Sequence, residues 1–248
     1  MDYNNEVVTR QNTAKERYEK LKQDRYEFLD RARECSELTI PALIPDEGFN
    51  SSSDLYSPFQ SVGARGVNNL ASKLLSLLLP PNSPFFRLKI SGDAKEEMES
   101  QKELTAQVEK SLANIEREVL NKIEELALRV SVFEALKHLI VGGNVLTYLP
   151  KNGNMKVFPL SQYVVRRDTA GNLLEIVIKE SIAHVALDKE IKEQMMIEGT
   201  YKEDEDCDIY THIYKLDNKK YYVCQEVMGM KIPSTIGTIM ADAMPYQA

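Results

Sequence analysis

Several residue types are scarce in this sequence of 248 residues, which has no tryptophan, three histidines and three cysteines. Cys35, Cys207 and Cys224 lack the spacing of a disulfide framework, and the first ten residues, MDYNNEVVTR, lack the apolar stretch of a signal peptide. We therefore expect a protein of a reducing compartment that folds without disulfides. With 43% hydrophobic residues, the chain is long enough to bury a core of its own.

Long apolar runs are also missing. The longest is Leu74–Leu79, which lies inside a helical pattern, whereas a helix that crosses a bilayer needs roughly 20 apolar residues. The sequence therefore predicts no membrane span and no membrane partner.

Positive charge is in deficit. The formal net charge of −7 argues against a general nucleic-acid coat, which needs clustered lysine and arginine to release counterions from phosphates. DNA passing close by is still compatible with this charge. Residues 188–208 hold nine acidic residues and three lysines, a net charge of −6, so almost all of the excess lies in one segment.

The motifs that bind nucleotides or calcium are not found. Neither G-x-x-x-x-G-K-[ST] nor G-x-G-x-x-G occurs. Asp204, Asp206 and Asp208 have the spacing of the first three ligands of a calcium loop. However, Ile209 stands where that loop needs glycine and Lys215 stands where it needs a bidentate glutamate. The sequence thus predicts neither a nucleotide-driven motor nor a calcium site.

The remaining candidate chemistry is weak. Cys207, His212 and Cys224 include no C-x-x-C or H-x-x-x-H pair, and no fourth zinc ligand is visible. No histidine, including His138 and His184, has a nucleophile or an orienting carboxylate at a fixed local spacing. We therefore expect structural histidines, no enzyme activity, no cofactor and no metal. A hydrolase or nuclease that uses scattered acidic residues is the enzymatic alternative.

The first third of the chain predicts two helices and a strand. Apolar side chains repeat at 4-3-4-3 spacing over residues 14–38, broken only at Arg25, which predicts one long amphipathic helix. Residues 45–58 have the composition of an irregular loop. An apolar stripe over residues 62–78 predicts a second helix, and the alternation over residues 85–90 predicts a half-buried strand on which this helix packs.

Two further helices follow. Apolar residues at 4-4-3 spacing predict a helix from about Lys95 to Leu126, opened by a capping box of Ser100 and Glu103. A second capping box, Ser131 with Glu134, predicts a shorter helix that ends at 142–143, two glycines suited to a positive φ. The two helices should meet at a corner near residue 129.

The second half of the chain changes to the period of strands. Short β-prone runs at 145–149, 155–158, 163–167 and 173–178 alternate with turn sequences and predict an antiparallel meander. A helix at about 181–196 should follow, and then two strands, 209–216 and 220–227, joined by Asp217 and Asn218. The last residues, from about 230, contain no clear element.

These patterns predict an α+β protein in which long amphipathic helices pack with a small antiparallel β-meander. We expect a mainly helical part at 1–143, with the strand near 85–90, and a β-rich part at 144–248, with one helix near 181–196. Two long helices of mixed charge beside a small sheet offer more lateral surface than a compact monomer needs.

Five segments together are similar to one family, the portal or head-to-tail connector proteins of short-tailed, podovirus-type bacteriophages. Each motif alone is weak, but the similarity runs through nearly the whole chain. The segments are SVGARGVNNLASKL at 61–74, FEALK at 133–137, VGGNVL at 141–146, YVVRRD at 163–168 and DIYTHIY at 208–214.

The resemblance implies a structural subunit of a ring, with about twelve copies, at one vertex of a capsid. A packaging motor drives DNA through such a ring during genome packaging, DNA leaves through it on ejection, and the tail attaches to it. The chain would be the outer wing, with the stem, clip and crown expected beyond residue 248. It would belong to the virion after capsid assembly in the host cytoplasm. The implied partners are double-stranded DNA in transit, the terminase motor, a tail adaptor, and the scaffolding, major capsid and internal core proteins.

Two sets of residues are candidates for contacts. The basic set, for DNA or for a neighbouring subunit, is Arg65, Lys73, Arg166 and Arg167. The acidic set, for another subunit or virion protein, is Asp204, Glu205 and Asp206; a solvated loop is its alternative. The alternative function is a helical scaffold or adaptor protein of a virion that binds through the helix at 14–38 and forms no ring.

Overall fold

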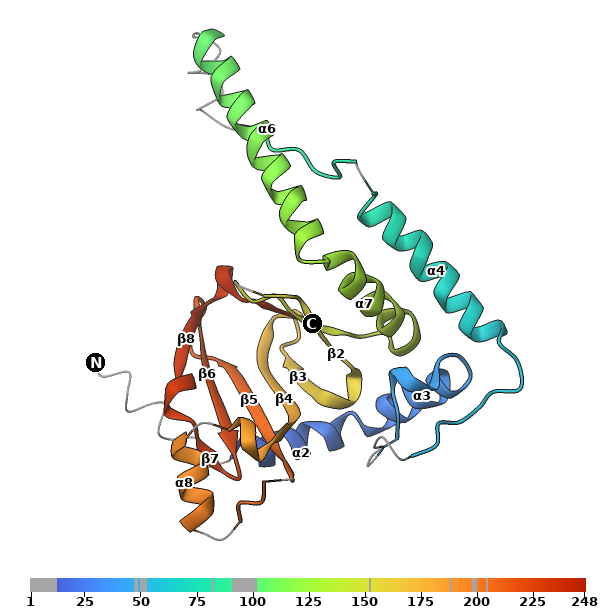
Figure 1. The fold of residues 1–248 in the computed structure, drawn as a ribbon, viewed down its shortest axis with the longest axis vertical. Helices are drawn as coiled ribbons and strands as arrows, with labels where there is room; N and C mark the ends of the chain where they lie inside the picture. Colours follow the sequence, from blue (N-terminus) through green and yellow to red (C-terminus); the bar gives the residue numbers. More distant parts are fainter. Residues whose placement is uncertain are drawn as a thin grey trace.

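The computed structural model describes residues 13–46, 49, 53–81, 83–90, 102–151, 153–187, 189–197, 200–203 and 205–248. It confirms the α+β class. Figure 1 shows a body of antiparallel strands, with helices beneath it and beside it, and an arm of three helices that rises from the body. Among the helices of the described ranges, none combines the length and the apolar composition that crossing a bilayer requires.

The predicted helix at 14–38 is two helices, α2 at Ala14–Asp24 and α3 at Tyr26–Glu37. They meet at Arg25, whose backbone leaves the helical region at φ −111° and ψ 14°. The guanidinium of Arg25 donates to the carbonyl of Leu160 at 2.6 Å and lies over the ring of Tyr163, 5.5 Å from its centroid. The prediction of a single long helix was therefore wrong, because Arg25, which interrupts the apolar spacing, bonds to Leu160 and packs on Tyr163.

The helix α4 has the predicted bounds, Val62–Leu78, and follows a 3-10 turn at Pro41–Leu43. A Cβ on Gly63 would lie 2.4 Å from the carbonyl oxygen of Leu38, so this glycine allows the close packing of α4 on the end of α3. The strand predicted at 85–90 is wrong, since these residues form no regular element. Instead, the amide of Leu88 donates to Oε1 of Glu116 at 2.5 Å.

Two helices complete the arm, α6 at Lys102–Glu125 and α7 at Leu128–Gly142. The predicted corner near 129 lies at Ala127, a left-handed residue with φ 48°. The predicted cap at Ser131 is wrong because its hydroxyl donates to the carbonyl of Met155 at 3.1 Å; the proposed cap Ser100 lies outside the described residues. Gly143 ends α7 at φ 71°, as predicted.

The strands form two antiparallel sheets rather than one meander. The smaller has the order β2-β1-β9 and the larger the order β3-β4-β5-β6-β7, with β8 also paired to β6. A 3-10 turn at Leu160–Gln162 separates β2 from β3, so these two strands do not pair. The bounds are β1 Leu146–Tyr148, β2 Lys156–Phe158, β3 Tyr163–Arg167, β4 Leu173–Ala183, β5 Asp206–Lys215, β6 Lys220–Val227, β7 Met230–Lys231, β8 Gly237–Met240 and β9 Tyr246–Gln247.

Two predictions in this half need correction. The helix expected at 181–196 begins late, because β4 continues to Ala183, which pairs with Asp206. A 3-10 turn at His184–Ala186 follows, and α8 occupies Lys189–Ile197. The segment from 230 does contain elements, namely β7, β8 and β9 with 3-10 turns at Pro233–Thr235 and Ala241–Ala243.

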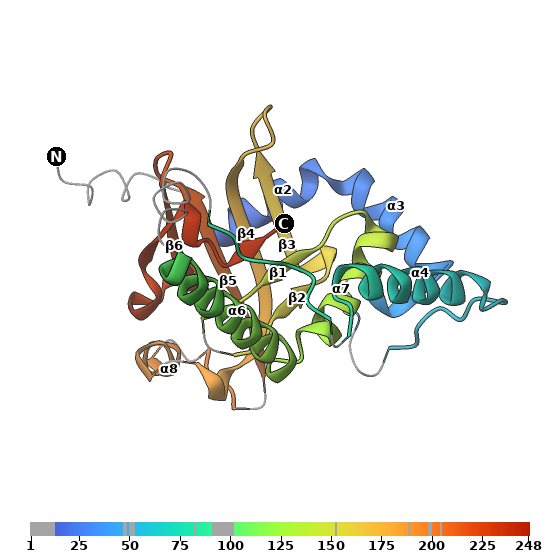
Figure 2. The ribbon, with the colours of Figure 1, turned by 90° about the horizontal axis from the view of Figure 1, so that it is seen from above.

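The core lies between the sheets and the helices α2 and α3. Leu29 of α3, Leu146 of β1 and Ile176 of β4 belong to one buried cluster. Tyr18 of α2 packs against Tyr210 of β5 in a second cluster, where the two rings meet edge to face with centroids 5.7 Å apart. The helices α2 and α3 thus cover the sheets (Figure 2), and of the arm the helix α7 reaches this core through Val141.

Candidate interaction surfaces

The helix α4 buries only part of its apolar stripe. Val67 and Ala71 are buried, facing α7, which is the helix that α4 chiefly contacts. Val62, Leu70 and Leu77 are exposed, and Leu77 keeps 79% of its surface accessible. The sequence predicted that this helix packs on a strand at 85–90; in the structure it packs on α7 instead and leaves one side open.

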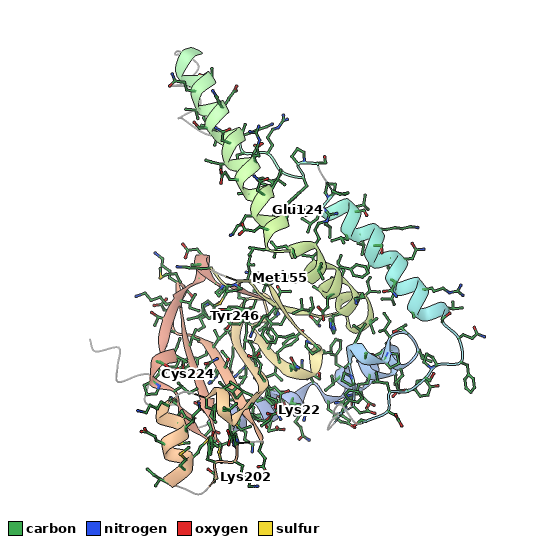
Figure 3. All side chains as sticks on the ribbon, viewed as in Figure 1. Lys22, Glu124, Met155, Lys202, Cys224 and Tyr246 are labelled. Carbon is green, nitrogen blue, oxygen red and sulfur yellow. The ribbon has the colours of Figure 1, made fainter. Side chains whose placement is uncertain are left out.

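The helix α6 is more open still, since none of the side chains described along it, residues 105–125, is buried. Ile115 and Val119 are exposed at 49% and 40%. In Figure 3 the part of α6 on the N-terminal side of the labelled Glu124 extends away from the sheets, and its side chains project on both sides of the helix. A helix with this apolar stripe and no covering layer is typical of a surface that a partner occupies.

The four basic candidates lie in two places. Arg65 and Lys73 are exposed on α4, while Arg166 and Arg167 are exposed at the end of β3. Arg167 donates to the carbonyl of Gly171 at 3.1 Å and to that of Ala248 at 2.7 Å, and so ties the residue after β9 to the β3–β4 turn. Arg166 lines a surface hollow with Lys215 and Asp217. The structure therefore does not gather the four into one basic patch.

The acidic candidates lie at the start of β5 and just before it. Asp204 lies outside the described residues. Glu205 is exposed and pairs with Lys202, 2.6 Å from Oε1 to Nζ, and Asp206 is exposed at the first position of β5. Their neighbour Asp208 pairs with Lys179 at 2.9 Å. Exposed pairs of this kind are weak, so the segment is an acidic surface whose charge is partly neutralised.

The strongest polar cluster lies between α2 and the larger sheet, and the sequence did not suggest it. Nε of Arg17 donates to Oε1 of Glu175 at 3.0 Å, and Nε2 of His212 lies 2.7 Å from the same oxygen. Because an ionised carboxylate only accepts hydrogen bonds, Nε2 of His212 carries the hydrogen. Glu226, also buried, accepts from the amide of Ala14 at 2.6 Å, at the N-terminus of α2.

The electrostatics of this cluster favour a stabilising role rather than a catalytic one. Burial acts to raise the pKa of Glu175, but the hydrogen bonds from His212 and Arg17 outweigh it and lower that pKa to about 2. A carboxylate that stays ionised at neutral pH and is sealed under a helix is unsuited to proton transfer. It fixes α2 on the sheet.

The other two histidines are also buried. Nδ1 of His184 accepts from the amide of Lys202 at 3.1 Å. Burial lowers the pKa of His138, whose Nδ1 has no hydrogen-bond partner in α7 or in the described segments around it. Within the described part of the chain, no group of three or more histidine, cysteine or carboxylate residues is placed to hold a metal ion. The three cysteines are free, and burial raises the pKa of the Cys224 thiol to about 11.

Comparison with known proteins gives a consistent result. The family described as bacteriophage head to tail connecting protein matches residues 11–246. The portal protein of Escherichia phage T7 is 44% identical over 240 residues, which is 94% of this chain and 45% of the T7 protein. That of Enterobacteria phage T3 is 42% identical over 94% of this chain and 44% of its own length, and that of Enterobacteria phage SP6 is 33% identical over 79% and 38%. The chain thus spans less than half the length of these relatives.

Proposed function

This chain belongs to the family of bacteriophage head-to-tail connecting proteins, and from this premise we propose that it is a structural subunit of a phage portal ring. The observation that carries the proposal is the 44% identity to a portal protein over 94% of this chain. The ring forms the DNA passage at one capsid vertex and a platform for the packaging motor and the tail. The role assigned to this chain is structural and includes no catalytic step.

The described surfaces support an assembly of many copies. A closed ring needs two different faces on each subunit, because each subunit touches one neighbour on each side. The open apolar faces of α4 and α6 lie on different helices of the arm and offer two such faces. The adaptor alternative needs only one exposed face.

The domain assignment and the partners follow from the proposed role. We assign residues 1–143 to the mainly helical part of the outer wing and residues 144–248 to its β-rich part. We propose that a stem, a clip and a crown lie outside the 45% of the T7 portal protein that this chain matches. The proposed location is the virion, after assembly in the host cytoplasm. The proposed partners are the terminase motor, the tail adaptor, the scaffolding, major capsid and internal core proteins, and double-stranded DNA in transit.

The candidate contact residues have separate tests. We propose that Arg65 and Lys73 on α4, and Arg166 and Arg167 at the end of β3, contact DNA or a neighbouring subunit. Neutralising Arg166 and Arg167 together should lower DNA retention in filled heads, and unchanged retention would remove the DNA role.

The acidic set is tested by assembly. We propose that Asp204, Glu205 and Asp206 face another subunit or virion protein. Exchanging the three for serine should weaken ring assembly or capsid incorporation. Normal assembly and incorporation would show that the segment is a solvated surface.

The mass of the native particle tests the proposed function directly. We would measure it by light scattering after size exclusion and by counting subunits in electron micrographs. The measurement should be made on the 248-residue chain and on the longest natural protein that contains it, called the longest form below. A closed ring of about a dozen copies is the expected result for the longest form. A monomer in that form would overturn the proposal and favour the adaptor.

A further inference from the structure

The exposed side of α4 has the shape of a helix-packing surface. Val62, Gly66, Leu70 and Leu77 follow one another at spacings of four, four and seven residues, which puts them on the same side of the helix. A Cβ on Gly66 would meet nothing within 4 Å, so no described residue uses the space above this glycine. A glycine between exposed aliphatic side chains costs helix stability and leaves room for another helix to approach closely.

The side of α6 that carries Ile115 and Val119 is a second surface of this kind. Val108, Leu112 and Ile123 extend it at spacings of three and four residues and are only half-buried. The amide of Leu88, in the segment that precedes α6 in the chain, bonds to Glu116, which by helical spacing borders this stripe on the same side as Glu109. The open centre of the stripe is formed by Ile115 and Val119.

The charges of the two helices are complementary. α4 contains two basic residues, Arg65 and Lys73, and no acidic residue, a net charge of +2. α6 contains six acidic and four basic residues, a net charge of −2. By helical spacing, Glu109 borders the open stripe of α6 on one side, and Glu118 borders it on the other side together with Lys122, whose charge is paired with Glu125 at 3.0 Å. Two copies of the α4 face would bring like charges together, whereas α4 against α6 brings opposite charges together.

We propose that the open face of α4 in one copy packs against the open face of α6 in the next copy of the ring. This inference rests on the proposed function and adds the pair of surfaces that build it. α6 continues from the N-terminal end of α7, whereas α4 lies beside α7 (Figures 1 and 2), so a contact between them joins two different surfaces and is head-to-tail, with one surface of each copy for each neighbour. Leu77 and Ile115 lie at its apolar centre, and Lys73 faces a carboxylate such as Glu118.

Cysteine cross-linking in the longest form of the protein tests this contact. The parent carries Cys35→Ser, which removes the exposed thiol, and the test variant adds Leu77→Cys and Ile115→Cys. Oxidation should convert the double variant into a ladder of covalent multimers on a non-reducing gel. An equimolar mixture of the two single variants should stop at covalent dimers, and the parent should stay monomeric.

The alternative outcomes are distinct. Dimers from either single variant alone would show a two-fold contact and overturn the proposal. An intrachain link, or no link at all, would also overturn the proposal if the particle has the mass of a ring. Another segment or another virion protein would then cover these helices. If the mass is that of a monomer, the proposed function itself fails.

Surface substitutions provide a second test that does not depend on disulfide geometry. Leu77→Glu should lower the concentration of assembled ring at least about tenfold, because it places a charge in the apolar centre of the contact. Ile197→Glu on α8, where the side chain is 86% exposed, is the matched control and should assemble normally. Lys73→Glu should weaken assembly, and Glu118→Lys in the same chain should restore part of it. Equal loss in Leu77→Glu and Ile197→Glu would contradict the proposal.

Discussion

Nε2 of His212 lies 2.7 Å from Oε1 of Glu175, and the two side chains keep only 4% and 3% of their surface exposed. Arg17 of α2 donates to the same carboxylate, so one buried charge on β4 binds groups from two other elements. Removing one member of a buried charged group leaves the others without compensation, which costs more than losing an exposed pair.

We therefore expect Glu175→Gln to lower the free energy of unfolding by about 2–4 kcal/mol, measured by urea denaturation at pH 7. Glu180→Gln is the matched control on the same strand, because Glu180 is half-buried and pairs with Lys156 at 3.5 Å. It should change the free energy of unfolding by less than about 1 kcal/mol. Similar losses in the two variants would show that the buried cluster adds nothing to stability.

The same carboxylate predicts a pH dependence. The pKa of Glu175 is about 2 in the folded protein against an ordinary value of 4.5, so between these values the folded state binds fewer protons than the unfolded state. The stabilisation is present above pH 4.5 and is lost as pH falls towards 2. The difference in free energy of unfolding between the native chain and Glu175→Gln should shrink by about 3 kcal/mol over this window. A difference that is the same at pH 6 and pH 2.5 would contradict the assignment.

Two glycines of α4 form a matched pair. Gly63→Ala should destabilise the protein by about 1–3 kcal/mol, because its Cβ would lie 2.4 Å from the backbone oxygen of Leu38. Gly66→Ala should stabilise the isolated chain by about 0.5–1 kcal/mol, since its Cβ meets nothing and alanine favours a helix. Thermal unfolding of both variants is the measurement, and a change of the same sign in both would be inconsistent with these contacts.

Arg167 has a local effect on stability. Arg167→Ala removes the hydrogen bond to the carbonyl of Ala248, but the side chain is exposed, so the free energy of global unfolding should change by less than about 0.5 kcal/mol. Amide hydrogen exchange in β9 and in β1, which pairs with it, should become faster. Arg166→Ala, one residue earlier, keeps this hydrogen bond and is the control. Equal acceleration in both variants would assign the effect to charge rather than to this bond.

The elements that were predicted well are bounded by residues that end helices or form turns, close by in the sequence. α4 ends before two prolines, and the β5–β6 hairpin turns at Asp217, whose Oδ1 accepts from the amides of Lys219 and Lys220. The prediction of a strand at 85–90 fails because a strand depends on a neighbour that is distant in the sequence. Alternation indicates a strand only where another strand lies alongside, and here the neighbouring element is α6.

The surfaces were harder to predict than the elements. The spacing of Leu70 and Leu77 gives a helix with an apolar side, but it does not say whether the same chain covers that side. The buried cluster has no spacing signal, because Arg17 and Glu175 are separated by 158 residues. Its one local sign in the sequence is a single acidic residue, Glu175, within the apolar run LLEIVI at 173–178. Arg25 was visible as the break in an apolar repeat, although its role in bending the helix was not.

The pairing of β1 with β9 also affects how the chain folds during its synthesis. The hairpin of β1 and β2 can form once Phe158 has left the ribosome, but Gln247, the partner of Thr147, emerges much later. At about 5–20 residues per second, the open edge of β1 waits roughly 5–20 s for its third strand. During this interval, nascent copies on one messenger RNA expose the same unpaired strand to one another. Before β9 is synthesised, the edge of β1 is therefore open to pairing with a strand of another chain, and in the folded chain β9 occupies that edge.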